Sequence, residues 1–229
     1  MKKQRYFSKV ELSILISSIV LIVGSFLIFD RHNYINMFAS LIGSVALIVC
    51  AKANPLGQAL MIVFILIYAY ISWTFRYYGE MITYLGMSLP GAIFSLISWL
   101  KNPSEKGKAE VKINSLSIKE VGIVFIVSIL ITIAFYFILQ SFNTKNLFIS
   151  TLSVFTSFLA GYLTFRRCKF FTIAYAFNDI VLIIMWILAT IQDIGYLSVV
   201  ICFIVFLVND FYGFINWSKM KRQQEKLKN

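Results

Sequence analysis

The chain contains eight apolar runs, each long enough to cross a lipid bilayer as a helix. A membrane-spanning helix needs about 20 predominantly apolar residues, because the hydrocarbon core is about 30 Å thick and a helix rises about 1.5 Å per residue. The predicted spans are 11–29, 37–51, 56–75, 81–100, 120–140, 146–165, 170–190 and 196–216. Backbone polar groups in hydrocarbon must bond within the protein, so these runs predict an all-α membrane protein of about eight transmembrane helices.

Composition supports this class and leaves no room for a separate soluble domain, since 59% of the 229 residues are hydrophobic and only 14% are charged. The net charge of +11 does not indicate a nucleic-acid partner, because the basic residues sit between the apolar runs. With a cytoplasmic N-terminus, 18 of the 21 Lys and Arg residues are cytoplasmic, leaving Arg31, Arg76 and Lys145 outside. This bias predicts a multi-pass protein of the cell inner (plasma) membrane with both termini in the cytoplasm.

An internal repeat is visible when the sequence is shifted by 118 residues. The shift aligns Cys50 with Cys168, and ISWLK at 97–101 with INWSK at 215–219, without a gap. It pairs spans two to four with spans six to eight, which predicts a 3+1+3 parallel repeat preceded by an extra N-terminal helix. Transporters built in this way hold their substrate near the membrane midplane, between the two halves.

The repeat divides the chain into five parts. They are an N-terminal peripheral helix (1–36), a first three-helix repeat (37–101), a cytoplasmic loop and linker helix (102–145), a second three-helix repeat (146–217) and a basic cytoplasmic tail (218–229). The loop 101–119 is predicted to be a solvated linker. Trp99 and Trp217, at helix ends beside lysine, are interpreted as part of the interfacial aromatic belt. Pro90 predicts an interruption of the fourth span.

Two Asn-Asp pairs, Asn178-Asp179 and Asn209-Asp210, lie inside the last two spans, about 12 Å from their cytoplasmic ends. Polar groups are costly at this depth and are functional candidates by default. We expect Asn178 and Asn209 to face each other across a shared wet hollow, with Trp186 two turns from Asn178 on the same face. An aromatic surface beside amides suits a flat, uncharged or cationic heteroaromatic ligand with hydroxyl groups. The alternative is that the amides join helices.

The stretches YGEMITYLGMSLPGAIFSLISWLKNP, NDIVLIIMWILA and YLSVVICFIVFLVNDFYGFINWSKM resemble the PnuC family of nicotinamide riboside transporters, which is related to the SWEET sugar transporters. The resemblance covers the chain from about residue 35 onward. It implies vitamin B3 uptake for pyridine nucleotide biosynthesis by facilitated diffusion, a possible homotrimer, and trapping of the substrate by a cytoplasmic kinase. It also implies substrate-binding residues, with Trp186 stacking on the pyridinium ring. The other candidates are Asn178, Asp179, Asn209, Asp210, Tyr212, Asn216, Tyr68, Gln58 and Tyr84.

We therefore predict a transporter that takes up nicotinamide riboside by alternating access, without a cofactor or metal. A lack of basic residues within the spans disfavours a phosphorylated cargo. The alternatives are a carrier of thiamine or another vitamin or nucleoside, ion-coupled uptake through Asp179 and Asp210, and a substrate-binding subunit of a larger importer. An enzyme is disfavoured because the single histidine, His32, lies off the spans. The three cysteines lack CxxC spacing, so we interpret them as reduced thiols that contribute to packing.

Overall fold

The computed structural model describes residues 6–74, 78–104 and 110–227. Eight helical segments within this part of the chain are long and apolar enough to cross a membrane, as predicted. They are α1 (Lys9–Phe29), α2 (Tyr34–Ala51), α3 (Leu56–Thr74), a segment made of α4 (Tyr78–Thr83), η1 (Tyr84–Ser88) and α5 (Leu89–Lys101), α6 (Ile118–Ser141), α7 (Leu147–Phe165), α8 (Phe171–Thr190), and a segment made of η2 (Ile194–Tyr196) and α9 (Leu197–Lys226).

Local sequence signals explain where several helices begin. The Ser8 hydroxyl accepts a hydrogen bond from the Glu11 backbone N–H, and the Glu11 carboxylate accepts one from the Ser8 backbone N–H, which forms a complete capping box for α1. The Ser117 hydroxyl caps α6 in the same way at the Glu120 N–H. Pro55 immediately precedes α3, where its missing N–H costs nothing.

The fourth span is interrupted at the position that Pro90 predicted. Tyr84–Ser88 forms a π-helical turn between α4 and α5, and Pro90 occupies the first turn of α5. Proline cannot donate a hydrogen bond to the preceding turn, and its ring displaces the carbonyl four residues earlier. A widened turn relieves this clash, and such turns occur frequently at functional sites.

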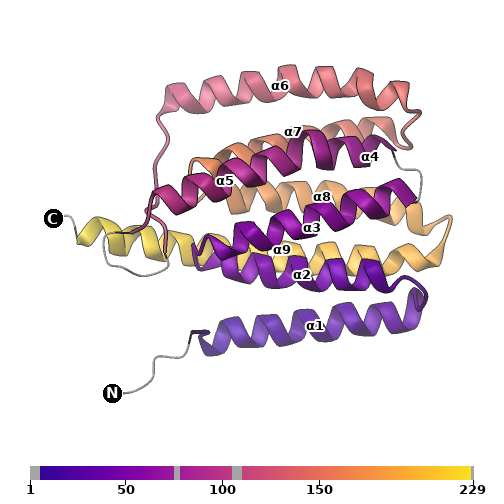
Figure 1. The fold of residues 1–229 in the computed structure, drawn as a ribbon, viewed down its shortest axis with the longest axis horizontal. Helices are drawn as coiled ribbons and strands as arrows, with labels where there is room; N and C mark the ends of the chain where they lie inside the picture. Colours follow the sequence, from indigo (N-terminus) through magenta and orange to yellow (C-terminus); the bar gives the residue numbers. More distant parts are fainter. Residues whose placement is uncertain (1–5, 75–77, 105–109, 228–229) are drawn as a thin grey trace.

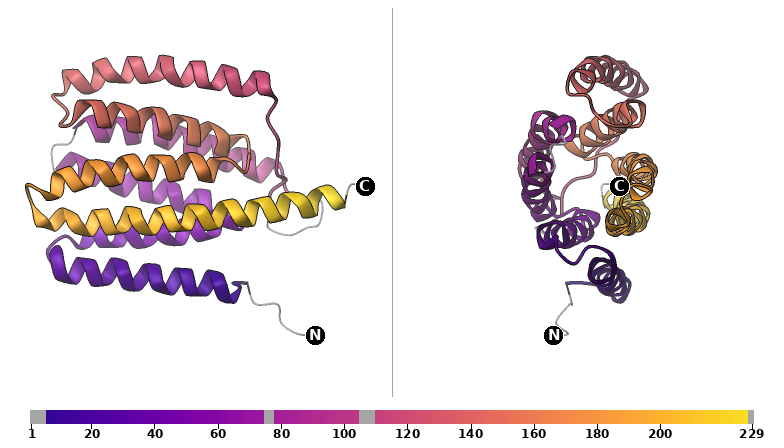
Figure 2. Two further views of the ribbon diagram at one scale, coloured as in Figure 1. Left: turned by 180° about the vertical axis from the view of Figure 1, so that it is seen from behind. Right: turned by 90° about the vertical axis from the view of Figure 1, so that its right-hand side faces the viewer.

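The helices form a closed ring with two further helices outside it. α2, α3 and the α4 to α5 span make one row, and α7, α8 and α9 make the other (Figure 2). The rows are joined because α2 packs against α9 and α5 packs against α7. α1 lies outside the ring against α2 and α9, whereas α6 lies outside it against α7, at opposite edges of the molecule (Figure 1). The helices of the first row lie within residues 34–101, those of the second row lie within residues 147–226, and α6 lies between them in the chain.

One end of the ring, where α1 begins and α9 ends, carries the turns that contain Lys52, Arg166 and Arg167, and we call it the basic end. Here Trp99 and Trp217 are fully buried, with ring centroids 5.3 Å apart, and the Phe171 ring lies 4.8 Å from that of Trp217. The prediction that both tryptophans belong to the interfacial belt is therefore wrong. They form the centre of a dry cluster between the two rows, which we call the aromatic plug.

Each of the two indoles also joins one row to the other. Trp99 on α5 donates its N–H to the Thr164 carbonyl of α7 at 2.9 Å, and Trp217 on α9 donates to the Cys50 carbonyl of α2 at the same distance. These bonds compensate for burying the indole N–H groups. The plug thus closes the space between the rows at the basic end.

The linker between the two rows packs beneath the plug. Val111 is fully buried, and its backbone N–H donates to the Ala53 carbonyl at 2.9 Å. The Asn114 N–H donates to the Arg167 carbonyl at 3.0 Å, and Gln224 of α9 bonds the backbone on both sides of Lys112. The prediction of a solvated linker is wrong for residues 110–114, which form a strap across the basic end; residues 105–109 of that prediction lie outside the described residues.

Candidate functional site

A cavity of about 720 Å³ lies inside the ring, between the two rows and above the plug. This volume is within the range of small-molecule binding sites in proteins. Five of the predicted binding residues line it, and they come from both rows. They are Gln58 of α3, Tyr84 of η1, Asn178 and Asp179 of α8, and Asp210 of α9.

The polar groups of α8 are held in place by neighbouring helices. The Asn178 side-chain oxygen accepts hydrogen bonds from the Thr156 and Ser157 hydroxyls of α7, each at 2.8 Å. Its amide nitrogen remains as the group that a ligand can engage. Asp179 lies one residue further along, and its carboxyl group is within hydrogen-bonding reach of that of Asp210. The second row thus supplies an amide and two carboxyl groups at one depth.

A stripe of small residues on α7 completes this wall of the cavity. Ser150, Ser153, Ser157 and Gly161 all line it. Their spacing of three and four residues places them on one helical face, a signal that was present in the sequence and that we did not use. Small residues at these positions leave room for a ligand beside Asn178.

Glu80 is a second lining residue that sequence reasoning missed. It lines both the large cavity and a smaller pocket nearer the opposite end of the ring. The inward position of Glu80 follows from the packing of α4 against α3, which no local signal in the sequence would have shown.

The smaller pocket, of about 100 Å³, contains two of the predicted aromatic residues, Trp186 and Tyr68. The Trp186 ring lies 5.4 Å from that of Tyr196, and the buried Tyr68 ring lies 5.5 Å from that of Tyr84. Trp186 shares a helical face with Asn178 as predicted, but two turns of α8 separate the indole from the amide. A ligand group that stacks on Trp186 would therefore lie at a different depth from a group that bonds to Asn178.

The remaining predicted residues, Asn209, Tyr212 and Asn216, face α1 and α2. The Asn209 amide donates to the Val205 carbonyl at 2.8 Å and to the Ser18 hydroxyl of α1 at 3.4 Å. The expectation that Asn178 and Asn209 share a hollow is therefore wrong. Residues 209 and 210 are about 100° apart on the helix, so it is Asp210 that faces the cavity.

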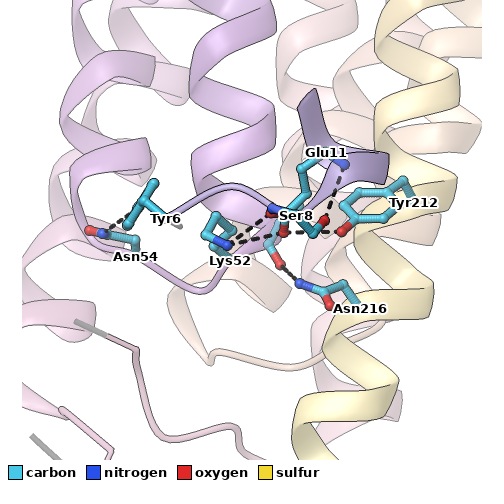
Figure 3. A network of polar contacts seen from close by, with 8 residues as sticks. Tyr6, Ser8, Glu11, Lys52, Asn54, Tyr212 and Asn216 are labelled. Atoms are coloured by element: carbon cyan, nitrogen blue, oxygen red, sulfur yellow. Dashed lines mark hydrogen bonds and ion pairs between the residues drawn. The ribbon is translucent and has the colours of Figure 1, made fainter. Parts of the chain in front are cut away.

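Tyr212 and Asn216 belong to a clamp at the basic end that joins α9 to α1 and α2 (Figure 3). The Tyr212 hydroxyl donates to the buried Glu11 carboxylate at 3.0 Å, and the Lys52 ammonium contacts both oxygens of that carboxylate at 3.0 and 3.1 Å. The Asn216 amide donates to the Ala51 carbonyl at 2.8 Å. This geometry favours the alternative that these two side chains join helices.

The electrostatics of the interior are one-sided. The charged residues that line the large cavity within the described part of the chain are Glu80, Asp179 and Asp210, all acidic. The smaller pocket adds Asp30 and Asp193. Burial raises the pKa of Asp30, and the nearby charge of Asp193 adds to this. Such an interior favours a cationic ligand over an anionic one.

Three comparisons place the chain among known proteins. The model of the family described as nicotinamide mononucleotide transporter matches residues 33–219. The nicotinamide riboside transporter PnuC of Neisseria mucosa is 22% identical over 200 residues, which cover 86% of this chain and 76% of that one. The protein of the same name from Haemophilus influenzae is 20% identical over 192 residues, which cover 83% and 82% of the two chains.

A crystal structure of the vitamin B3 transporter PnuC has the same fold. It superposes with a TM-score of 0.82 over 95% of this chain and 94% of that one, at 22% sequence identity. The family match covers both rows of the ring and α6, and the structural match extends over nearly the whole chain. The chain therefore belongs to the nicotinamide mononucleotide transporter family, as a multi-pass membrane protein with the fold of PnuC.

Proposed function

We propose that this chain carries nicotinamide riboside into the cell by facilitated diffusion. The observation that carries the proposal is the cavity between the two rows, where amide, carboxyl and aromatic groups meet and where every charged group of the described lining is acidic. Nicotinamide riboside has a flat, cationic ring and a sugar with several hydroxyl groups. The two similar proteins from Neisseria mucosa and Haemophilus influenzae carry the name of this substrate.

The same observation argues against the mononucleotide in the family's name. A phosphate group is bound by Arg or Lys side chains or by the N-terminus of a helix. Here it would meet Asp179 and Asp210 in a low-dielectric interior, where repulsion between like charges is strong. The riboside brings one positive charge and no negative one.

The proposed mechanism is alternating access between the two rows. The cavity lies between them, and the aromatic plug and the strap close the basic end, which we assign to the cytoplasm. Separation of Trp99 from Thr164 and of Trp217 from Cys50 would open this side. Phosphorylation of the riboside by a cytoplasmic kinase would then prevent its return, so that no ion gradient is needed.

The test is uptake by the purified chain in proteoliposomes without an ion gradient. We expect labelled nicotinamide riboside to equilibrate across the membrane, to exchange with unlabelled riboside inside, and to be transported at least tenfold faster than the mononucleotide. Equal rates for the riboside and the mononucleotide would contradict the proposal. Liposomes without protein supply the background.

A second candidate substrate is thiamine, because its thiazolium ring is also a cation and suits the same acidic lining. Competition for riboside uptake by unlabelled thiamine separates the two.

Ion-coupled uptake through Asp179 and Asp210 is the remaining alternative. It predicts accumulation of riboside above equilibrium when a proton or sodium gradient is imposed, whereas facilitated diffusion predicts none.

A further inference from the structure

The carboxyl groups of Asp179 and Asp210 meet at the wall of the large cavity. They come from the adjacent helices α8 and α9, only 4% and 3% of the two residues is exposed, and the two groups are within hydrogen-bonding reach of each other. Two ionised carboxylates this close repel each other strongly in a low-dielectric interior. The arrangement therefore needs something to stabilise it.

No positive group performs this role among the described residues around the pair. The titratable side chains that face it are Cys50 of α2, Glu80 of α4, Tyr84 of η1, Tyr175 of α8 and Cys202 of α9. In the described part of the chain, the Asp179 Oδ2 atom is buried without a hydrogen-bond donor. Buried acceptors nearly always have a donor, and a carboxyl group within reach can supply one when it carries a proton.

We propose that Asp179 and Asp210 hold one proton between them, so that the pair presents a single negative charge to the cavity and selects a ligand with a single positive charge on a flat ring. This inference rests on the proposed function, because it identifies the charge that the transported ligand must carry. It makes the pair a determinant of specificity and not a site of proton exchange. Water stabilises the negative charge of an exposed carboxylate, and at this buried pair the positive charge of the ligand takes that role.

If the pair shares one proton, single and double substitutions should differ in the charge that they leave at the cavity wall. An asparagine at either position imitates the protonated partner, since its amide donates to the remaining carboxylate and leaves one negative charge in place. Asparagine at both positions removes that charge. One substitution should therefore preserve the preference for a cation, and the second should abolish it.

The experiment compares nicotinamide riboside with its 1,4-dihydro form, which has the same atoms in its ring skeleton but no charge. Binding of both to the purified chain is measured by calorimetry. We expect the wild type, Asp179→Asn and Asp210→Asn to prefer the cation by roughly 30-fold, the size expected for one charge about 8 Å from the ring at an effective dielectric constant of about 20. The double variant should bind both forms within about threefold of each other. Glu225→Gln, an exposed charge in the tail of α9, is the control.

Two outcomes would overturn the inference. One is a preference that survives in the double variant, which would mean that another group provides the charge. The other is a preference that either single substitution abolishes, which would mean that the remaining carboxyl group carries no negative charge when its partner is replaced by asparagine. If the wild type bound neither form, the proposed function would fail instead.

Infrared spectroscopy tests the proton itself without any ligand and without the double variant. The wild type should show the carbonyl band of a protonated carboxylic acid that is absent from both Asp179→Asn and Asp210→Asn, while Glu225→Gln retains it. A difference spectrum without this band would rule out the shared proton, whatever the binding results show.

Discussion

The two ends of the ring are built from different kinds of aromatic contact. At the basic end, Trp99 and Trp217 are fully buried, their N–H groups are bonded to the backbone of the other row, and the strap at Val111 packs beneath them. At the opposite end, Trp186 and Tyr196 line a small pocket beside Asp30. The aromatic plug is packed without water, whereas the smaller pocket is lined by polar groups.

This difference teaches that tryptophan serves two purposes in one fold. A tryptophan whose N–H group is satisfied by a backbone carbonyl is part of the closed structure, and its removal should cost stability. A tryptophan that borders a polar pocket offers its face to a ligand, and its removal should cost binding. Four predictions test whether the two ends separate in this way.

The largest effect is expected from Trp217→Ala, which removes the centre of the aromatic plug. Loss of a fully buried indole and its hydrogen bond should lower the free energy of unfolding by about 4 kcal/mol, measured by denaturant titration in detergent. Phe211→Ala, on the exposed face of the same helix, should cost far less. Equal losses in the two variants would show that the plug does not close the basic end.

The next effect concerns the clamp on α1, also at the basic end. Lys52→Met leaves the Glu11 carboxylate buried without its ion partner, and we expect a loss of about 2 kcal/mol in the free energy of unfolding. Adding Glu11→Gln should recover part of this loss, because the unpaired charge is then gone. A double variant as unstable as the sum of the two single variants would refute the ion pair's contribution.

At the opposite end, Trp186→Ala should weaken binding of nicotinamide riboside about tenfold, as expected for loss of one aromatic contact with the ligand. Calorimetry measures the affinity, and thermal unfolding should show a smaller change than for Trp217→Ala. Trp73→Ala, which removes an exposed indole, is the matched control. Unchanged affinity would mean that the ligand does not reach the smaller pocket.

The smallest effect is a pH dependence at Asp30. Its pKa is raised by burial, so the folded state favours the protonated form. This contribution to stability is complete below the ordinary pKa of aspartate, about 4, and is lost as the pH rises through the folded-state value. Asp30→Asn should therefore raise the Tm slightly at pH 7 and not at pH about 4. A lower Tm at pH 7 would contradict the assignment.

The spans were predictable because length and apolar composition report directly on the thickness of the bilayer. The depth of the Asn-Asp pairs follows from the same rise per residue, and Pro90 identified the interruption of the fourth span. These features are determined by residues that are close together in the sequence, so they can be predicted without knowledge of the tertiary packing.

The facing direction of each polar residue was not predictable in the same way. α9 contacts α1, α2 and α8, so it is apolar on most sides, and the pattern does not show which side meets the cavity. Asn209 and Asp210 were therefore assigned together although they face different partners. Trp99 and Trp217 posed a similar problem, because a tryptophan beside lysine at a helix end suits both a lipid interface and a buried contact.

The π-helical turn at Tyr84–Ser88 makes the fourth span sensitive to chain length and not only to side-chain chemistry. Such a turn takes up one residue more than an α-helical turn would, and its wider winding absorbs that residue, so Glu80 faces the interior. A residue inserted between Glu80 and this turn would not be absorbed, and it would rotate Glu80 by about 100° away from the interior. No single substitution in α4 can produce that rotation.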